Sequence, residues 1–164
     1  MILELFNKVY NYKVSYHLKN DVSYKFVTDD GRIFYVIFDT FDYKFGYKAL
    51  TIDFGEKKGS KLIMNITNDG NAFSILSTVI NIVMKYFNKE RDIDIIFISA
   101  YDYEPTKVSL YGKLIDRFST LGYKVVDKFR DSGYYVFCLA NKDIDKIKKI
   151  IKGVYKNDTE ISDR

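Results

Sequence analysis

The chain has 164 residues, which suits one globular domain and is short for two. Hydrophobic residues make up 47% of it and charged residues 29%, so a packed core is expected and wholesale disorder is excluded. Lysine and arginine number 26 against 22 acidic residues, and the formal charge of +4 is too small to indicate a nucleic-acid-binding protein. The single cysteine and single histidine exclude an internal disulfide and metal sites built from several such residues.

The sequence also bears on location. No apolar run reaches the roughly 18 residues of a membrane-spanning helix. Residues 1–6 lack the basic segment and the small-residue cleavage site of a secretory signal peptide, so we expect a cytoplasmic protein. The abundance of Lys, Asn, Ile, Tyr and Phe is typical of an AT-rich genome, such as that of a low-GC bacterium or its phage. For a phage protein the expected location is the host cytoplasm.

The first part of the chain, residues 9–67, is predicted to form strands and turns. Its β-branched and aromatic segments alternate in the manner of strands at residues 22–27, 33–38, 47–54 and 61–67. Asp29-Asp30-Gly31 favours a hairpin, because glycine adopts a positive φ at little cost. A charged turn is expected at 55–59. Together these segments predict an antiparallel meander.

After Gly70 the spacing of apolar residues changes to three and four, which indicates an amphipathic helix. The expected inward residues are Phe73, Leu76, Val79 or Ile80, Val83 and Phe87. Residues 93–98 are almost continuously apolar, as in a strand covered on both faces. Strand, helix and strand in this order predict a right-handed crossover between parallel strands.

A second helix is predicted to begin at Pro105 and to end at Gly122, a residue suited to a helix C-cap. Its expected inward face is Val108, Tyr111, Leu114, Ile115 and Phe118. A hairpin of residues 123–130 and 134–140 follows. The last predicted helix is rich in lysine and carries Ile144, Ile147, Ile151 and Val154 on its apolar side.

The predicted fold is therefore a single α/β domain of residues 1–156. It has a mixed, mostly antiparallel sheet, two helices between strands and a C-terminal helix. Residues 157–164 are polar and are expected to form a disordered tail.

Two loops lie where α/β sheets place ligands, beyond the carboxyl ends of the parallel strands. Residues 68–72 lead into a helix N-terminus, whose free N–H groups and dipole favour a phosphate. The alternative is that they form only a turn and an N-cap. Residues 100–104 lead toward Tyr111, which is either a core tyrosine or, where other features agree, a catalytic one.

Several motifs around these two loops occur in a consistent order and spacing. Residues 67–72 match the loop pattern Gln/Arg-x-x-Gly-x-Gly/Ala at Gly70 and Ala72, and the aliphatic pair Ile75-Leu76 follows. Leu110-Tyr111 on the second helix is followed by Gly122-Tyr123. With these motifs the segment 67–123 resembles the core of the GCN5-related N-acetyltransferase (GNAT) superfamily, and it is similar to diverged members encoded by tailed phages.

The resemblance implies a fold with a central pair of splayed parallel strands and transfer of acetyl from acetyl-CoA to an amine. It implies that Tyr111 protonates the departing CoA thiolate, which a phenol of pKa about 10 can do. The exposed edge of strand 61–67 would pair with the pantetheine arm, and no metal is implied. The residues implied to hold the pyrophosphate are Ile66, Thr67, Asn68, Asp69, Gly70, Asn71, Ala72, Phe73 and Ser74.

The chain also departs from the family. Thr67 stands where Gln or Arg is usual, and the N-terminal third reads as strands where members have a helical pair. The helix after Tyr111 is longer than in most members. No residue is marked as the general base, and Asp53, Glu56 and His17 are candidates by chemistry alone.

Other residue types that can do chemistry have simpler interpretations. The acidic groups 29–30, 92–94 and 102–104 lack the spacing of known metal sites and are interpreted as turns and solvated edges. Cys138 lies in an apolar strand and is expected to be buried and inert.

Three functions remain open. The first is an acyl-CoA-dependent N-acyltransferase acting on an unknown amine, either as a monomer or as a homodimer. The second is a non-catalytic binding protein of the same fold, such as a phage product that binds a host protein. The third is a nucleic-acid-associated protein, suggested by the lysines of residues 142–156, which are interpreted more simply as a solvated helix face.

Overall fold

The structure is a computed structural model that describes residues 8–63, 72–90, 92–101, 105–131 and 134–162. Within these residues the chain forms two compact units. The first unit consists of the residues up to 40 together with 52–92, and the second consists of 41–51 together with the residues from 93 onward. The single domain predicted for residues 1–156 stays a prediction.

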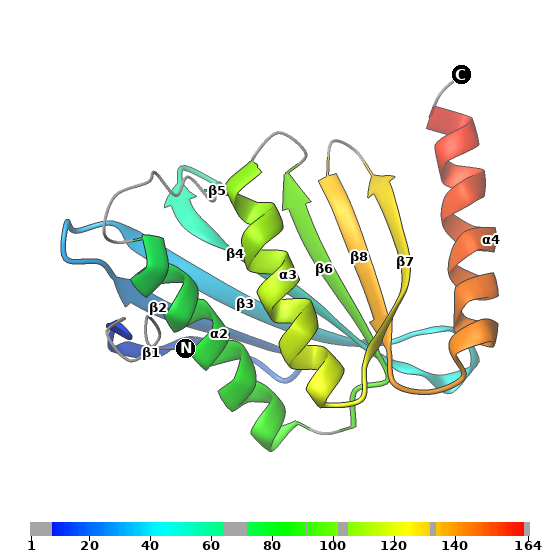
Figure 1. Ribbon diagram of the computed structural model, residues 1–164, viewed down its shortest axis with the longest axis horizontal. Coiled ribbons are helices and arrows are strands. Elements are labelled where there is room, and N and C mark those ends of the chain that lie inside the picture. The colour runs from blue at the N-terminus through cyan, green and yellow to red at the C-terminus, as the bar shows by residue number, and fades with distance from the viewer. Residues whose placement is uncertain (1–7, 64–71, 91, 102–104, 132–133, 163–164) are drawn as a thin grey trace. The chain divides into compact units, whose positions relative to one another are not determined.

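In its described residues the first unit is an antiparallel sheet with one helix (Figure 1). Its elements are β1 (Tyr12–His17), β2 (Asp21–Val27), β3 (Ile33–Asp42), the later part of β4 (Lys48–Lys58), β5 (Lys61–Ile63) and α2 (Ala72–Lys89). Strands β2 and β3 pair regularly from Asp21 opposite Asp39 to Val27 opposite Ile33. The turn between them contains Gly31 at φ +83°, which confirms the predicted hairpin.

The core of the first unit is aromatic. Phe34 and Phe38 alternate with outward residues along β3 and are fully buried. The ring of Phe38 stacks on Tyr86 of α2 with 4.0 Å between centroids, and Phe34 stacks on Phe26 of β2 at 5.3 Å. Helix α2 therefore covers this face of the sheet, and large flat rings fill the space between them.

Helix α2 confirms most of the predicted apolar stripe. The buried members of that stripe are Leu76, Val79, Val83 and Phe87. Phe73 was predicted to point inward but is 51% exposed, while its neighbour Ser74 is buried. Apolar periodicity identifies the face of a helix, but it does not show how far the neighbouring elements extend over the first turn.

Strand β4 continues through the segment that was expected to be a turn. It runs to Lys58, and β5 doubles back and pairs with it from Glu56 opposite Ile63 to Lys58 opposite Lys61. A Cβ atom on Gly55 would lie 2.9 Å from the backbone nitrogen of Ile63, so only glycine allows this approach. The turn predicted at 55–59 is therefore wrong in extent, and residues 64–67 of the predicted strand lie outside the described residues.

The second unit contains the start of β4, three further strands and two helices (Figure 1). These elements are β6 (Ile95–Tyr101), α3 (Pro105–Thr120), β7 (Lys124–Asp131), β8 (Tyr134–Ala140) and α4 (Ile144–Ser162). The hydrogen-bonded strand order is β4-β6-β8-β7. Strand β8 is antiparallel to both β6 and β7, and β4 is parallel to β6.

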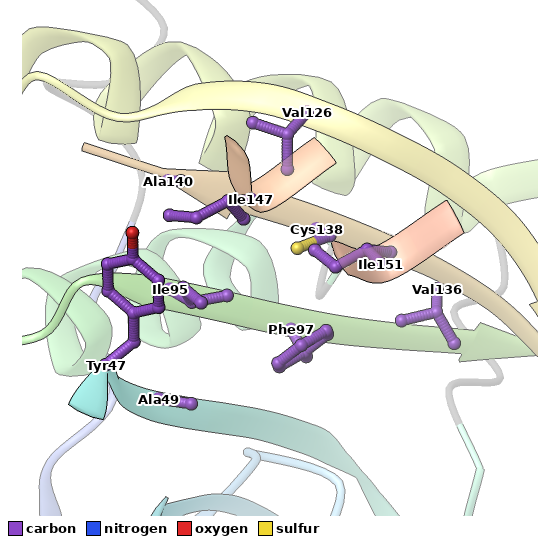
Figure 2. Packing of buried hydrophobic residues seen from close by; sticks show 10 residues of the cluster. All are labelled: Tyr47, Ala49, Ile95, Phe97, Val126, Val136, Cys138, Ala140, Ile147 and Ile151. Atoms are coloured by element: carbon purple, nitrogen blue, oxygen red, sulfur yellow. The ribbon is translucent and has the colours of Figure 1, made fainter. Parts of the chain in front are cut away.

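Side chains of β8 alternate between two helices. Val136, Cys138 and Ala140 belong to a buried cluster that Ile147 and Ile151 of α4 complete (Figure 2). Phe137, which points the other way, stacks on Tyr111 of α3 with 5.3 Å between centroids. Helices α3 and α4 therefore pack on opposite faces of β8, as expected for a strand covered on both sides.

Helix α3 begins and ends where the sequence predicted. It starts at Pro105, and Gly122 beyond its end has φ +92°. The Tyr123 N–H donates to the Phe118 carbonyl and the Gly122 N–H to the Ser119 carbonyl, which together form a Schellman motif. The rings of Phe118 and Tyr123 pack edge to face across this turn.

Helix α4 carries its lysines on the side opposite to its buried isoleucines. Ile147 and Ile151 are fully buried, whereas Lys148, Lys149 and Lys152 are exposed. These lysines therefore form an exposed helix face, and the nucleic-acid-associated alternative stays a prediction. The helix runs to Ser162, so residues 157–162 of the predicted tail are helical.

Within the described residues, the architecture is a mixed, mostly antiparallel sheet with the adjacent parallel strands β4 and β6 and three helices. This confirms the predicted fold class, and the divergence of the parallel pair stays a prediction. The described residues before α2 form strands and one short 3-10 turn, Lys44–Gly46, in place of a helical pair. None of the described helices is long and apolar enough to cross a lipid bilayer.

Candidate functional site

Only the last three residues of the predicted cofactor loop are described. Residues 66–71 lie outside the described residues, whereas Ala72, Phe73 and Ser74 form the first turn of α2. Backbone N–H groups of a first turn have no intrahelical acceptor, and this turn contains no acidic side chain. The helix end is thus electrostatically suited to an anion, and its binding of pyrophosphate stays a prediction.

Tyr111, the predicted general acid, lies on the inner face of α3. Its side chain is 2% exposed and its ring stacks on Phe137. Its hydroxyl donates a 2.7 Å hydrogen bond to the backbone carbonyl of Ser99, in the second half of β6. The phenol is therefore held in one orientation by the strand that precedes α3, and its catalytic role stays a prediction.

Tyr123 has a similar arrangement in the same unit. It is 4% exposed, and its hydroxyl donates a 2.5 Å hydrogen bond to the carbonyl of Ile93. Burial, with a smaller contribution from the carboxylate of Asp94, raises the pKa of Tyr123 to about 12. Since no motif assigns chemistry to Tyr123, it is a matched structural reference for Tyr111.

The candidate bases are in three different environments. Glu56 is 6% exposed and is ion-paired with Arg32 at 3.0 Å and with Lys58 at 3.4 Å. Asp53 on β4 and His17 at the end of β1 are both exposed. The role of base stays unassigned among the three.

Cys138 is fully buried, as predicted. It lies in the cluster beneath α4 (Figure 2), and burial raises the pKa of its thiol. A thiol that stays protonated and inaccessible is a poor nucleophile and a poor metal ligand.

The acidic groups also have local structural partners. Asp29 is paired with Lys8 at 2.7 Å, and Asp30 accepts a hydrogen bond from the Thr28 hydroxyl. The described residues contain no group of three or more histidine, cysteine, aspartate or glutamate side chains placed to hold a metal ion. Residues 102–104 lie outside the described part of the chain.

Sequence reasoning missed two like-charged pairs in the first unit. Lys13 faces Lys25 across β1 and β2, and Asp21 faces Asp39 across β2 and β3. The two-residue alternation of strand 21–27 does place Asp21 and Lys25 on one face. Their partners follow only from the strand register, which is not readable from a single sequence.

No protein-family model matches the sequence, and no curated protein matches it. Among solved structures, the chain is similar to an aminoglycoside N(6')-acetyltransferase from Legionella pneumophila, with 16% identity and a TM-score of 0.43. That match covers 77% of this chain and 66% of the other. It is also similar to a ribosomal-protein-S5-alanine acetyltransferase from Vibrio fischeri, with 10% identity and a TM-score of 0.46, covering 75% of this chain and 63% of the other.

A third similar structure is a spermidine N-acetyltransferase from Vibrio cholerae in complex with CoA and spermine. Its identity is 12% and its TM-score 0.41, over 74% of this chain and 64% of the other. The chain therefore spans less than two thirds of the length of each of these three proteins. With TM-scores of 0.46 or less, these likenesses do not decide the activity, substrates or partners of this chain.

Proposed function

We propose that the protein is an acyl-CoA-dependent N-acyltransferase of the GNAT type, a diverged phage-type member that acetylates an amine in the cytoplasm. The observation that carries the proposal is the placement of Tyr111. The helix that bears Leu110-Tyr111 follows β6 directly and ends at Gly122-Tyr123 in a Schellman motif. The order of elements is the one that the sequence resemblance implies, and the inward position of this tyrosine is the one that the apolar spacing of the helix predicts.

The proposed chemistry assigns one proton transfer to Tyr111. Acetyl-CoA supplies the acyl group, and the CoA thiolate is its leaving group. A phenol of ordinary pKa, about 10, can donate to a thiolate of similar basicity without a large change in its own pKa. In the resting structure the same proton is donated to the Ser99 carbonyl, which fixes the direction of the hydroxyl. The first turn of α2, free of acidic side chains, would hold the pyrophosphate.

One observation favours a second candidate, a non-catalytic binding protein on the same fold. The Tyr111 hydroxyl has a backbone acceptor and is 2% exposed, as a purely structural tyrosine would be. Thr67 in place of Gln or Arg removes a polar contact that family members make to the pyrophosphate. In this case the chain would act by binding another protein, such as a host protein.

The test compares two tyrosine variants of the full chain. We expect acetyl-CoA to bind in calorimetry and to raise the melting temperature. Turnover is then measured as CoA released in the presence of polyamines, aminoglycosides or peptide amines. Because Cys138 is buried, a thiol reagent added to the folded protein reports free CoA. Tyr111→Phe is expected to lower kcat by roughly 100-fold, the contribution of a general acid.

Tyr123→Phe is the matched control, since it removes a similar buried hydroxyl. Both variants are expected to lose about 1 kcal/mol of stability from the lost hydrogen bond, and only Tyr111→Phe should lose activity. Binding without turnover on any amine, with equal effects of the two variants, favours the non-catalytic protein. Absence of acetyl-CoA binding to the wild-type chain would overturn the proposal.

A further inference from the structure

Two buried side-chain oxygens of β2 have no hydrogen-bond partner among the described residues. They are Oδ1 of Asp21 and the hydroxyl oxygen of Ser23, a residue that is 0% exposed. A buried polar atom without a partner lowers the stability of a fold, so such atoms usually bind a water molecule or an ion. Neither residue belongs to the predicted cofactor loop or to α3. An inference about them therefore does not rest on the proposed acyltransferase function.

Both oxygens belong to side chains on the sheet face opposite to α2. On β2, Tyr24 packs edge to face on Phe38, and the Phe38 ring stacks on Tyr86 of α2. Side chains alternate along a strand, so Ser23 and Asp21 leave the other face together. Strands β2 and β3 pair from Asp21 to Val27 without a register shift, which keeps this alternation intact.

Asp39 of β3 brings a second carboxylate to the same face. It is the direct cross-strand partner of Asp21. The Thr40 N–H donates to the carbonyl of Asn20, so the next pair along, Asp21 and Asp39, is a non-hydrogen-bonded pair of the ladder. Opposing side chains approach most closely in such pairs. The two carboxyl groups are accordingly in hydrogen-bond contact with each other.

No described basic side chain neutralises this carboxylate pair. Neither Asp21 nor Asp39 forms an ion pair within the described residues. Lys25 leaves the same face, but four residues of strand place its Cα about 13 Å from that of Asp21. Like charges directly opposite each other destabilise a strand pair. Both aspartates are only half-buried, so an ion from the solvent can reach the counter-charge position between them.

We propose that Asp21, Asp39 and Ser23 form a binding site for a hard divalent cation such as Mg²⁺ or Ca²⁺. The cation lies between the two carboxylates, takes the Ser23 hydroxyl oxygen as a third protein ligand and keeps water on its solvent side. It supplies the missing counter-charge and satisfies both buried oxygens at once. Carboxylate, hydroxyl and water oxygens are the ligands that these two cations prefer.

The spacing along β2 allows this arrangement. Residues two apart on a strand have Cα atoms about 6.7 Å apart, and both side chains leave the same face. Two oxygens bound to one cation, each at about 2.0–2.6 Å, lie up to about 4–5 Å apart. The side chains of Asp21 and Ser23 can therefore reach one ion. With only two charged ligands the site is expected to be weak, with a Kd of about 1 mM.

The test uses the full chain after removal of bound metal with a chelator. At pH 7, about 10 mM MgCl₂ or CaCl₂ should raise the melting temperature by about 3–6 °C relative to NaCl of the same ionic strength. Mn²⁺ serves as a paramagnetic substitute for either cation. It should broaden amide signals most strongly at residues 21–23 and 37–39.

Variants then assign the ligands. Asp21→Asn and Asp39→Asn each remove one of the two charges and should weaken Mg²⁺ binding roughly tenfold in calorimetry. Ser23→Ala should weaken it severalfold. Without cation, Ser23→Ala should keep or raise the melting temperature, because it removes a buried hydroxyl that has no partner.

Asp42→Asn is the matched control, since Asp42 is an exposed aspartate at the end of β3. Its affinity for Mg²⁺ should equal that of the wild type. The proposal would be overturned if MgCl₂ and CaCl₂ stabilised the chain no more than NaCl, or if Mn²⁺ broadened other regions most strongly. Equal weakening by Asp39→Asn and Asp42→Asn would overturn it as well.

Discussion

Two buried tyrosines of the second unit and a lysine pair of the first unit differ in how their polar groups are compensated. In the second unit, Tyr111 and Tyr123 are buried and donate their hydroxyl protons to backbone carbonyls. In the first unit, strand pairing places Lys13 opposite Lys25 without an acidic partner among the described residues. The Tyr111 and Tyr123 hydroxyls are satisfied by backbone carbonyls of their own unit, whereas the first unit carries a lysine pair that no described acidic side chain balances.

The acidic pair of the first unit shows the same imbalance. Asp21 and Asp39 face each other across β2 and β3, and Asp21 Oδ1 is buried with no hydrogen-bond partner among the described residues. Satisfied buried groups mainly stabilise a fold, while unbalanced ones lower stability unless a proton or a ligand compensates them. The comparison places the uncompensated charges among the described residues of the first unit at two cross-strand pairs, whereas in the second unit Tyr111 has a sequence motif that suggests chemistry.

The largest expected effect comes from removing an aromatic ring from the core of the first unit. Phe38 is fully buried and stacks on Tyr86. Phe38→Ala should lower the free energy of unfolding by about 3–5 kcal/mol, measured by denaturant titration, because a cavity replaces the ring. Phe45→Ala is the control, since that ring is 73% exposed and its loss should change stability by less than about 0.5 kcal/mol.

Hydrogen exchange on Phe38→Ala sharpens the comparison of the units. If the two units unfold separately, the amides of β2 and β3 lose protection and those of β6 and β8 keep it. Uniform loss of protection would show a single cooperative unit and would contradict separate unfolding.

Replacing a glycine by alanine should change the stability of the protein in opposite directions in the two units. A Cβ atom at Gly55 would lie 2.9 Å from backbone nitrogen of β5, so Gly55→Ala should destabilise the first unit by about 1–3 kcal/mol. At Gly112, inside α3, a Cβ atom would have no neighbour within 4 Å. Gly112→Ala should therefore stabilise by about 0.5–1 kcal/mol. Thermal melts measure the stability change of both variants. Destabilisation by Gly112→Ala would contradict the absence of neighbouring atoms around a Cβ at this position.

Features fixed by local physics were predictable from the sequence. The end of α3 follows from Gly122, because only a residue tolerant of positive φ forms this turn, and it was placed correctly. The hairpin at Gly31 was predicted on the same ground. In contrast, Phe73 was placed inside although it is exposed, because the cover over the first turn of α2 depends on residues far along the chain.

Features fixed by non-local pairing were not predictable. The extension of β4 to Lys58 depends on β5 folding back against Gly55, and the sequence alone suggested a turn there. The candidate site was predicted only in part. Tyr111 could be selected by its motif, but its hydrogen bond to the Ser99 carbonyl depends on how α3 packs against β6. The Lys13–Lys25 pair requires the register of two strands, which no local signal specifies.

The smallest expected effect concerns pH and the acidic pair of the first unit. The hydrogen bond with Asp21, together with burial and charge repulsion, raises the pKa of Asp39 from 3.8 to about 6. The folded state then binds this proton more tightly than the unfolded state. Its contribution to stability is complete below about pH 4 and is lost as the pH rises through about 6. Wild-type stability should therefore carry a component that falls between these two values.

Asp39→Asn should remove that component. The amide of the new side chain can donate to Asp21 at any pH, so the variant should be more stable than wild type at pH 7 by roughly 0.5–1 kcal/mol and equal to it near pH 4. Urea titrations at several pH values measure the difference between the two proteins. Asp42→Asn, an exposed position at the end of the same strand, should keep the wild-type profile. If the free energy of unfolding depends on pH in the same way for wild type and Asp39→Asn, the facing carboxylates of Asp21 and Asp39 do not destabilise the fold at neutral pH. The contrast between the two units would then rest on the lysine pair alone.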